Sequence, residues 1–133
     1  MKGHCLCGKT AWEVQGEASW AGYCHCDDCR RNCGAPVVAW LGVSLQHFRW
    51  IADEPKYFKS SEGVLRHFCE TCGSPMGFEA KRFPDEIHLY AASLENPEQY
   101  QPSFHVFHGR KLSWLDLHDN LPKHAGTLTP SNE

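Results

Sequence analysis

The chain has 133 residues, a usual length for one domain that buries its own core. Its formal net charge is −3, and its 13 basic side chains form no basic run, which argues against nucleic-acid binding. No stretch reaches the roughly 20 apolar residues that a membrane span needs, and the segment from Met1 lacks the apolar core of a secretory signal. We therefore expect a cytoplasmic protein that does not enter a membrane.

Short apolar, β-prone runs alternate with Gly, Pro, Asn and Asp along most of the chain, a pattern that predicts many short strands. The expected strands are 10–14, 36–43, 48–51, 64–68, 76–79, 87–91 and 105–107. Helix is expected only in short turns, over 27–32, which ends before Gly34, and over 96–100, where Asn96 is a candidate N-cap. The sequence thus predicts a mainly β fold with short helical turns.

Seven of the eight cysteines are separated from another cysteine by one or two residues. In a chain without a secretory signal this spacing favours metal sites, with disulfides as the alternative. Cys5 and Cys7 form one such pair and Cys69 and Cys72 another, and a glycine that permits a tight turn follows each pair. Together the two pairs predict a closed site for a structural zinc ion, unless each pair binds separately or stays free.

Cys24, Cys26 and Cys29 form a third group, and no second pair remains to complete it. Three protein ligands leave one position open, which is typical of a catalytic zinc that binds water or substrate there. The alternative is a second structural ion whose fourth ligand is a histidine or Cys33, which lies one helical turn beyond Cys29. The spacing therefore predicts two zinc ions per chain.

Candidate substrate contacts lie close to this third group and in a later segment. Arg30 can attract a carboxylate, although it can equally be a solvated charge on a short helix. His105, Arg110 and Trp114 share one segment that could form a wall of a pocket for an acidic ligand.

His25 lies between two expected ligands, and we expect it to face away from the ion and to make a hydrogen bond at the surface or in support of a ligand. The other histidines form no evident HxxH or HExxH motif. No Ser-His-Asp order, phosphate-binding loop or pair of carboxylates indicates a hydrolase or a kinase.

The ordered motifs resemble those of the glutathione-dependent formaldehyde-activating enzyme family, which includes centromere protein V. The motifs are CLCG from Cys5, CHCDDCRRNCGAP after Tyr23, FCETCGSPMGF from Phe68 and HVFHGRKLSWLDLHDNLP from His105. The likeness covers 3–122 and implies an Mss4-like, or β-tent, fold of short antiparallel strands pinned by zinc. We expect a single zinc-binding domain over 1–122, followed by a polar C-terminal tail, 123–133, that frays.

The resemblance also implies roles for the cysteines and a reaction. Structural zinc would be held by Cys5, Cys7, Cys69 and Cys72, and catalytic zinc by Cys24, Cys26 and Cys29. The implied activity is that of a carbon–sulfur lyase on a thiol–aldehyde adduct, with glutathione and formaldehyde giving S-(hydroxymethyl)glutathione. The alternatives are a non-enzymatic zinc module that binds a partner protein and a thiol redox or metal sensor. No feature of the sequence sets the oligomeric state.

Overall fold

The computed structural model of the protein describes residues 1–128. Contacts group the chain into two compact units, each described by itself. The first unit comprises Met1–Trp20 and Leu41–Tyr100, and the second comprises Ala21–Trp40 and the residues from Gln101 on. The single domain expected over 1–122 stays a prediction.

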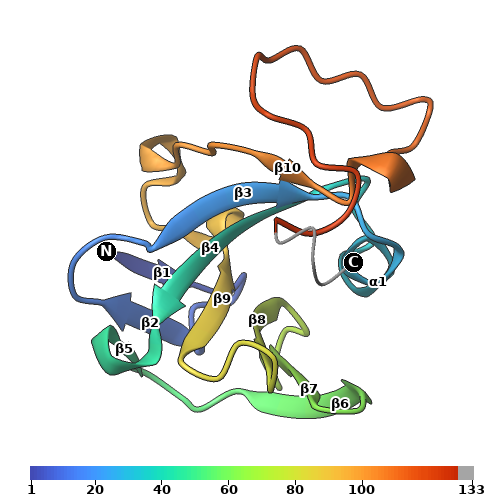
Figure 1. Ribbon diagram of the computed structural model, residues 1–133. Coiled ribbons are helices and arrows are strands. Elements are labelled where there is room, and N and C mark those ends of the chain that lie inside the picture. The colour runs from blue at the N-terminus through green and yellow to red at the C-terminus, as the bar shows by residue number, and fades with distance from the viewer. Residues whose placement is uncertain (129–133) are drawn as a thin grey trace. The chain divides into compact units, whose positions relative to one another are not determined.

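The first unit is built from two sets of paired strands (Figure 1). One sheet has the order β1-β2-β5, with β1 at Lys2–His4, β2 at Ala11–Val14 and β5 at Phe48–Trp50. The other set has the order β4-β9-β8-β7-β6. Its strands are β4 (Val38–Ser44), which begins in the second unit, β6 (Lys56–Ser61), β7 (Val64–Phe68), β8 (Pro75–Ala80) and β9 (Glu86–Tyr90). Three 3₁₀ turns complete the unit, at Leu45–His47, Ala91–Ser93 and Pro97–Gln99.

Alternation of side chains places the core of this unit. In β2 the residues Trp12 and Val14 are buried while their neighbours are only half-buried, as expected for a strand with one face on the core. The largest fully buried apolar side chains of the unit likewise point into the core. They are Trp12, Val14, Val43, Met76, Ile87 and Leu89. The core therefore draws on both sets of strands.

Gly42 in β4 lies against the indole of Trp20, whose Nε1 donates to Glu86 Oε2 at 3.2 Å. A Cβ atom at position 42 would lie 2.0 Å from that Nε1, so the ring would have to move. We expect Gly42→Ala to lower the free energy of unfolding by about 1–3 kcal/mol, measured by urea unfolding. Gly77→Ala in β8 is the control, because the nearest atom there is 3.4 Å away. Equal urea midpoints for the two variants would contradict this account.

The second unit contains strands in the order β10-β3-β4 and one α-helix (Figure 1). β3 spans Trp20–Cys24, β10 spans His105–Val106, and a 3₁₀ turn follows at His108–Arg110. β10 pairs with β3 in parallel, with Val106 opposite Cys24. The strand pairs β1–β2, β2–β5, β6–β7, β7–β8 and β8–β9 are antiparallel, so this parallel pair differs from them. It places residues near the C-terminal end of the sequence beside the end of β3.

The helix α1 spans Asp27–Cys33 and has sequence signals at both ends. Cys26 is its N-cap, and acidic side chains in the first turn suit the positive end of the helix dipole. Gly34 ends the helix in the left-handed region at φ 61°, where its N–H donates to the Arg30 carbonyl. The sequence thus fixes a short helix directly after two of the cysteines.

The expected secondary structure is largely confirmed, although three further strands, β1, β3 and β6, were not expected. All seven expected strands are present, as is the helix, and the turn at Pro97–Gln99 is a 3₁₀ helix whose N-cap, Asn96, makes no side-chain capping bond. The first residues of the expected tail make backbone hydrogen bonds: the His124 N–H donates to the His105 carbonyl at 2.9 Å, and the Phe107 N–H donates to the Gly126 carbonyl at 2.8 Å. The fraying of the tail stays a prediction. The part of the expected tail at 129–133 lies outside the described residues.

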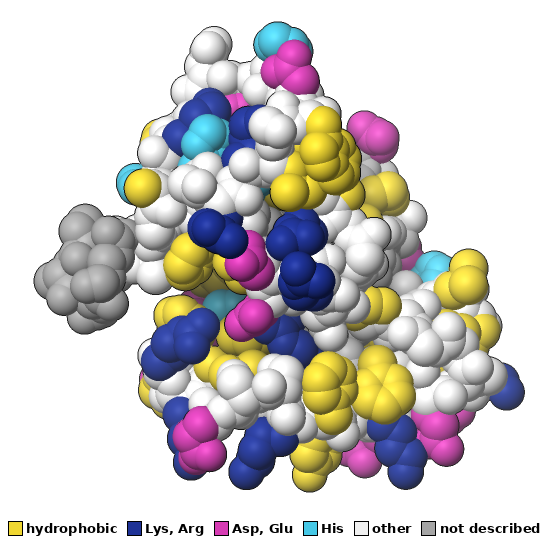
Figure 2. Space-filling view, turned by 90° about the vertical axis from the view of Figure 1, so that its right-hand side faces the viewer, with side chains coloured by type: hydrophobic (Ala, Val, Ile, Leu, Met, Phe, Trp, Pro, Cys, Tyr) yellow, Lys and Arg dark blue, Asp and Glu magenta, His cyan; other side chains and the backbone are white. Residues whose placement is uncertain are grey.

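Within residues 1–128, no helix combines the length and the apolar character required to cross a bilayer. Figure 2 shows basic and acidic side chains next to one another on the face it presents. The described part of that face therefore carries charges of both signs, and the expectation that nucleic acid is not a partner stays a prediction.

Candidate metal centres

Four thiols converge in the first unit, from Cys5, Cys7, Cys69 and Cys72, whose sulfur atoms all lie within 4.8 Å of one another. The Cys5 and Cys7 sulfurs are 3.6 Å apart, and those of Cys7 and Cys69 are 3.7 Å apart. A tetrahedral zinc ion with bonds of about 2.3 Å holds its sulfur ligands roughly 3.8 Å apart. The spacing of this four-cysteine cluster therefore fits a zinc ion, and all eight cysteines are free of disulfides.

Two similar turns hold these thiols in place. The Gly8 N–H donates to the Cys5 carbonyl at 3.1 Å, and the Gly73 N–H donates to the Cys69 carbonyl at 2.8 Å. Both glycines have positive φ, 82° and 77°, a conformation that most side chains disfavour. The Thr10 N–H also donates to the Cys5 sulfur at 3.3 Å, which stabilises negative charge there.

Hydrogen bonding prepares part of the four-cysteine cluster for a cation. The Ser74 hydroxyl lies 3.1 Å from the Cys72 sulfur and lowers the pKa of that thiol to about 5. The Thr10 side chain likewise lowers the pKa of Cys69. Because a cysteine binds metal as the thiolate, these two residues are disposed to act as ligands at neutral pH.

A second cluster of thiols lies in the second unit, where the sulfurs of Cys24, Cys26 and Cys29 fall within 4.8 Å of one another. Cys24 ends β3, Cys26 caps α1, and Cys29 is buried in the first turn of that helix. The Cys26 and Cys29 thiols, together with burial, raise the pKa of Cys24. Because three thiolates this close repel one another, a cation would stabilise them, so the donor set fits a metal ion and fills three of four tetrahedral positions.

Cys33 is not part of this three-cysteine cluster, although it lies one helical turn beyond Cys29. Its sulfur instead lies 4.0 Å from the Asn32 amide nitrogen. We therefore expect Cys33→Ser to retain two metal ions per chain, measured by elemental analysis of purified protein. A loss of one ion in this variant would show that Cys33 is the fourth ligand.

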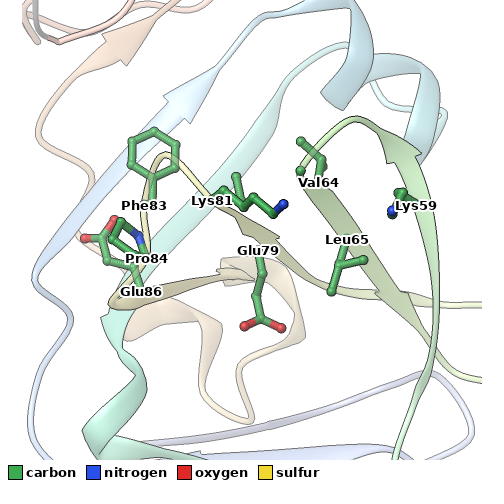
Figure 3. Close-up of a pocket in the computed structure, with 10 residues that line it drawn as sticks. Lys59, Val64, Leu65, Glu79, Lys81, Phe83, Pro84 and Glu86 are labelled. Carbon is green, nitrogen blue, oxygen red and sulfur yellow. The ribbon is translucent and has the colours of Figure 1, made fainter.

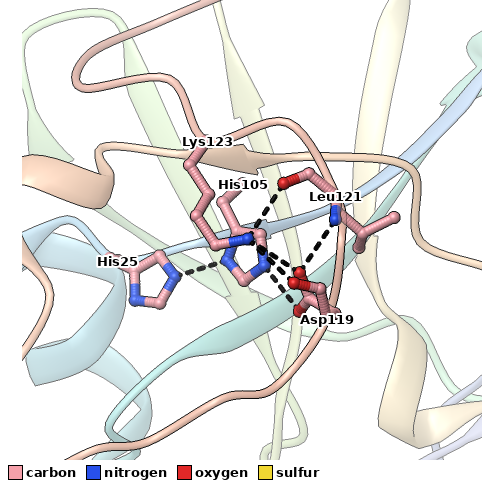
Figure 4. A network of polar contacts seen from close by, with 5 residues as sticks. All are labelled: His25, His105, Asp119, Leu121 and Lys123. Atoms are coloured by element: carbon pink, nitrogen blue, oxygen red, sulfur yellow. Dashed lines mark hydrogen bonds and ion pairs between the residues drawn. The ribbon is translucent and has the colours of Figure 1, made fainter.

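His25 is buried and bonds to another histidine, so the surface alternative expected for its hydrogen bond is wrong, while the ligand-supporting alternative stays a prediction. Its Nε2 lies 2.8 Å from His105 Nδ1, and His105 Nε2 lies 2.9 Å from Asp119 Oδ2 (Figure 4). His105 has no exposed surface, so in this structure it offers no direct contact to a ligand. No local pattern indicates this pairing, since His25 and His105 are 80 positions apart.

The other expected substrate contacts lie near the surface. Arg110 makes two hydrogen bonds to the Asp27 carboxylate, at 2.8 and 3.2 Å, and Arg30 lies 3.6 Å from the same group. Asp27 thus brings the two arginines together directly after Cys26, and Arg110 lowers the pKa of this carboxyl. Trp114 is 71% exposed. As substrate contacts, these residues remain predictions.

A shallow cavity of about 490 Å³ lies in the first unit, at the turn between β8 and β9 and beside the β6–β7 hairpin (Figure 3). Its lining mixes lysines and glutamates with apolar side chains such as Val64 and Phe83. It includes none of the cysteines or expected substrate residues. The cavity therefore adds no support to the acidic-ligand pocket expected from the sequence.

The sequence matches the profile of the glutathione-dependent formaldehyde-activating enzyme family over residues 1–110. It is 22% identical to a Halomonas elongata protein provisionally named glutathione-dependent formaldehyde-activating enzyme, over 88% of this chain and 80% of that protein. A crystal structure of a Rhodobacter sphaeroides protein shares the fold, with a TM-score of 0.61 and 27% identity over 72% of this chain and 89% of that one. The chain belongs to the glutathione-dependent formaldehyde-activating enzyme family.

Proposed function

We propose that the protein is a zinc-dependent carbon–sulfur lyase-type enzyme that forms or cleaves S-(hydroxymethyl)glutathione. In the forward direction the glutathione sulfur bonds to the formaldehyde carbon, the thiol proton passes to the new hydroxyl group, and nothing is oxidised. The observation that carries the proposal is the three-cysteine cluster, which could supply three of the four ligands of a tetrahedral ion. The family name supports the substrate class.

The two clusters of cysteines have different roles in this proposal. Cys24, Cys26 and Cys29 would hold an ion that stabilises a bound thiolate and polarises an aldehyde oxygen. The cysteines of the four-cysteine cluster fill a tetrahedral set by themselves, so we assign them a structural zinc. Eight free cysteines also suit a reducing compartment, in agreement with the cytoplasmic location we propose.

The arginines near Cys26 are candidates for holding the carboxylates of glutathione. Arg30 and Arg110 converge on Asp27, so a substrate carboxylate could approach two guanidinium groups at once. Asp27 neutralises part of that charge, which limits non-specific anion binding. Trp114, which is 71% exposed, can cover an apolar part of the substrate. His105 is fully buried, so we do not place it among the residues that touch the substrate.

The experiment follows the transfer of ¹³C-formaldehyde to glutathione by NMR, with two zinc ions per chain confirmed beforehand by elemental analysis. We expect adduct formation faster than in a protein-free solution. Replacing glutathione by 2-mercaptoethanol tests the substrate class, because the small thiol lacks the carboxylates that the arginines would bind. A fully metal-loaded protein with no rate above the background would rule out this reaction.

A non-enzymatic zinc module is the main competing function, and the ligand count separates the two. A module needs a closed second site, whereas the described thiols near α1 gather in a set of three without Cys33. An exchangeable fourth ligand, detected with cobalt as a spectroscopic substitute, would favour the enzyme.

A further inference from the structure

A buried hydrogen-bond chain leads from the C-terminal segment to the residue between two of the cysteines (Figure 4). It runs from Asp119 Oδ2 through both nitrogens of His105 to His25 Nε2. His105 is 0% and His25 1% exposed, so the hydrogen bond between the two rings is shielded from water, whereas the Asp119 side chain is 25% exposed. The proposed function does not require this chain, and its burial calls for an explanation.

The charge of Asp119 determines which nitrogen of each histidine carries the proton in this hydrogen-bond chain. The hydrogen bond from His105 and the nearby Lys123 ammonium group hold the pKa of Asp119 well below its usual range, so this carboxylate accepts. In a neutral imidazole, a proton on His105 Nε2 donates to this carboxylate and leaves a lone pair on Nδ1 to accept from His25 Nε2–H. Asp119 therefore selects the tautomer of both rings.

Asp119 is itself held firmly. Its Oδ1 accepts from the Leu121 N–H and from Lys123 Nζ, both at 3.0 Å. The main chain of His105 is fixed on both sides, by the Pro122 carbonyl and the His124 N–H, each at 2.9 Å. The hydrogen-bond chain thus ends on a carboxylate that has several partners of its own, and one of them, Lys123, belongs to the segment expected to be a polar tail.

The other end of the hydrogen-bond chain, His25, lies next to the three-cysteine cluster in the sequence. His25 is the single residue between Cys24 and Cys26, so its position and those of the two thiols are linked through the backbone. The His25 N–H also donates to the Val106 carbonyl at 3.1 Å, which ties the same segment to β10. A ring free to rotate would loosen this segment, whereas a ring bonded to His105 holds it.

We propose that Asp119 and His105 are positioning residues for the three-cysteine cluster: through His25 they hold Cys24 and Cys26 in the arrangement that binds metal. This inference rests on the proposed metal-binding role of that cluster. It assigns His105 a role in place of the substrate contact expected from the sequence.

A third metal site on His25, His105 and His108 is the competing interpretation, because their ring nitrogens lie within 4.8 Å of one another. Two nitrogens on one tetrahedral ion, each about 2.0–2.1 Å from it, are roughly 3.4 Å apart. The His25 and His105 nitrogens are only 2.8 Å apart, which is a hydrogen-bond distance. The geometry thus favours a hydrogen-bond chain.

Asp119→Asn tests the proposal in the full chain, since the amide keeps the shape of the carboxylate but loses its charge. Two quantities are measured: the histidine tautomers by ¹⁵N NMR, and zinc affinity at each cluster by chelator competition. We expect altered tautomers at His25 and His105 and an affinity about 10–100-fold weaker at the three-cysteine cluster, with the four-cysteine cluster unchanged. Asp119→Glu, which restores the carboxylate, should recover part of the affinity.

Asp116→Asn is the matched control, because Asp116 is 80% exposed and pairs with His118. Should Asp119→Asn fail to fold, Lys123→Met is the milder variant to use, because it keeps Asp119 and His105. We expect it to lose zinc affinity at the three-cysteine cluster, but less than Asp119→Asn would. If the wild type binds two zinc ions, two results would overturn this inference and leave the proposed function standing. One is an unchanged zinc affinity of the three-cysteine cluster in Asp119→Asn, and the other is an equal loss of that affinity in Asp116→Asn. A wild type that binds one ion would overturn the proposed function and this inference with it.

Discussion

Replacing Cys69 by serine is expected to leave the protein unfolded or aggregated. Cys69 is 1% exposed, and its sulfur meets that of Cys7 across 62 positions of sequence. Binding of a structural zinc ion supplies on the order of 10–16 kcal/mol in small zinc domains, comparable with the whole stability of a typical domain. The measurements are the yield of soluble protein and the far-UV circular dichroism spectrum.

Cys33→Ser is the control for Cys69→Ser, because it makes the same chemical change outside both thiol clusters. We expect it to retain the wild-type spectrum and melting temperature. A Cys69→Ser protein that melts with the wild type would show that the four-cysteine cluster does not stabilise the fold.

Cys26→Ser is expected to fold normally, to lose one of two zinc ions and to lose the activity with glutathione and formaldehyde. Cys26 is the N-cap of α1, where its sulfur accepts the Cys29 N–H at 3.3 Å. Serine is among the preferred N-cap residues, so the helix keeps its start while the metal loses a ligand. The three cysteines also lie within six residues, so their ion closes no long loop.

Zinc content, circular dichroism and the ¹³C-formaldehyde assay on one preparation separate these effects. Cys26→Ser should resemble the wild type in its spectrum and Cys69→Ser should not. Equal loss of solubility in the two variants would mean that the structural and catalytic roles have been divided wrongly.

Local sequence patterns were sufficient to predict most of the strands and the helix. Three strands were missed, β1, β3 and β6, and each was missed for a physical reason. β6 is exposed along its whole length, so it lacks the alternation of apolar and polar residues that marks a half-buried strand. β3 contains Gly22, which is unusual within a strand, and a Cβ there would lie 2.3 Å from the Phe104 ring. β1 is only three residues long.

The thiol clusters could be predicted because their ligands come in closely spaced pairs, and the same is true of α1 with its Gly34 cap. The contacts around them could not. The approach of Arg110 to Asp27 and of His105 to His25 depends on the parallel pairing of β10 with β3, which no local pattern indicates. Of the two roles expected for His25, a hydrogen bond at the surface or one in support of a ligand, the first is wrong for this reason.

The order in which residues are synthesised gives the hydrogen bond between His105 and Asp119 a further consequence. All members of the four-cysteine cluster have been translated once Cys72 is made, whereas His25 gains its side-chain support only after Asp119 is made. A nascent chain can therefore close its stabilising site while the three-cysteine cluster is still incompletely supported. Loading of the second ion is thus expected to be a late, post-translational step of maturation.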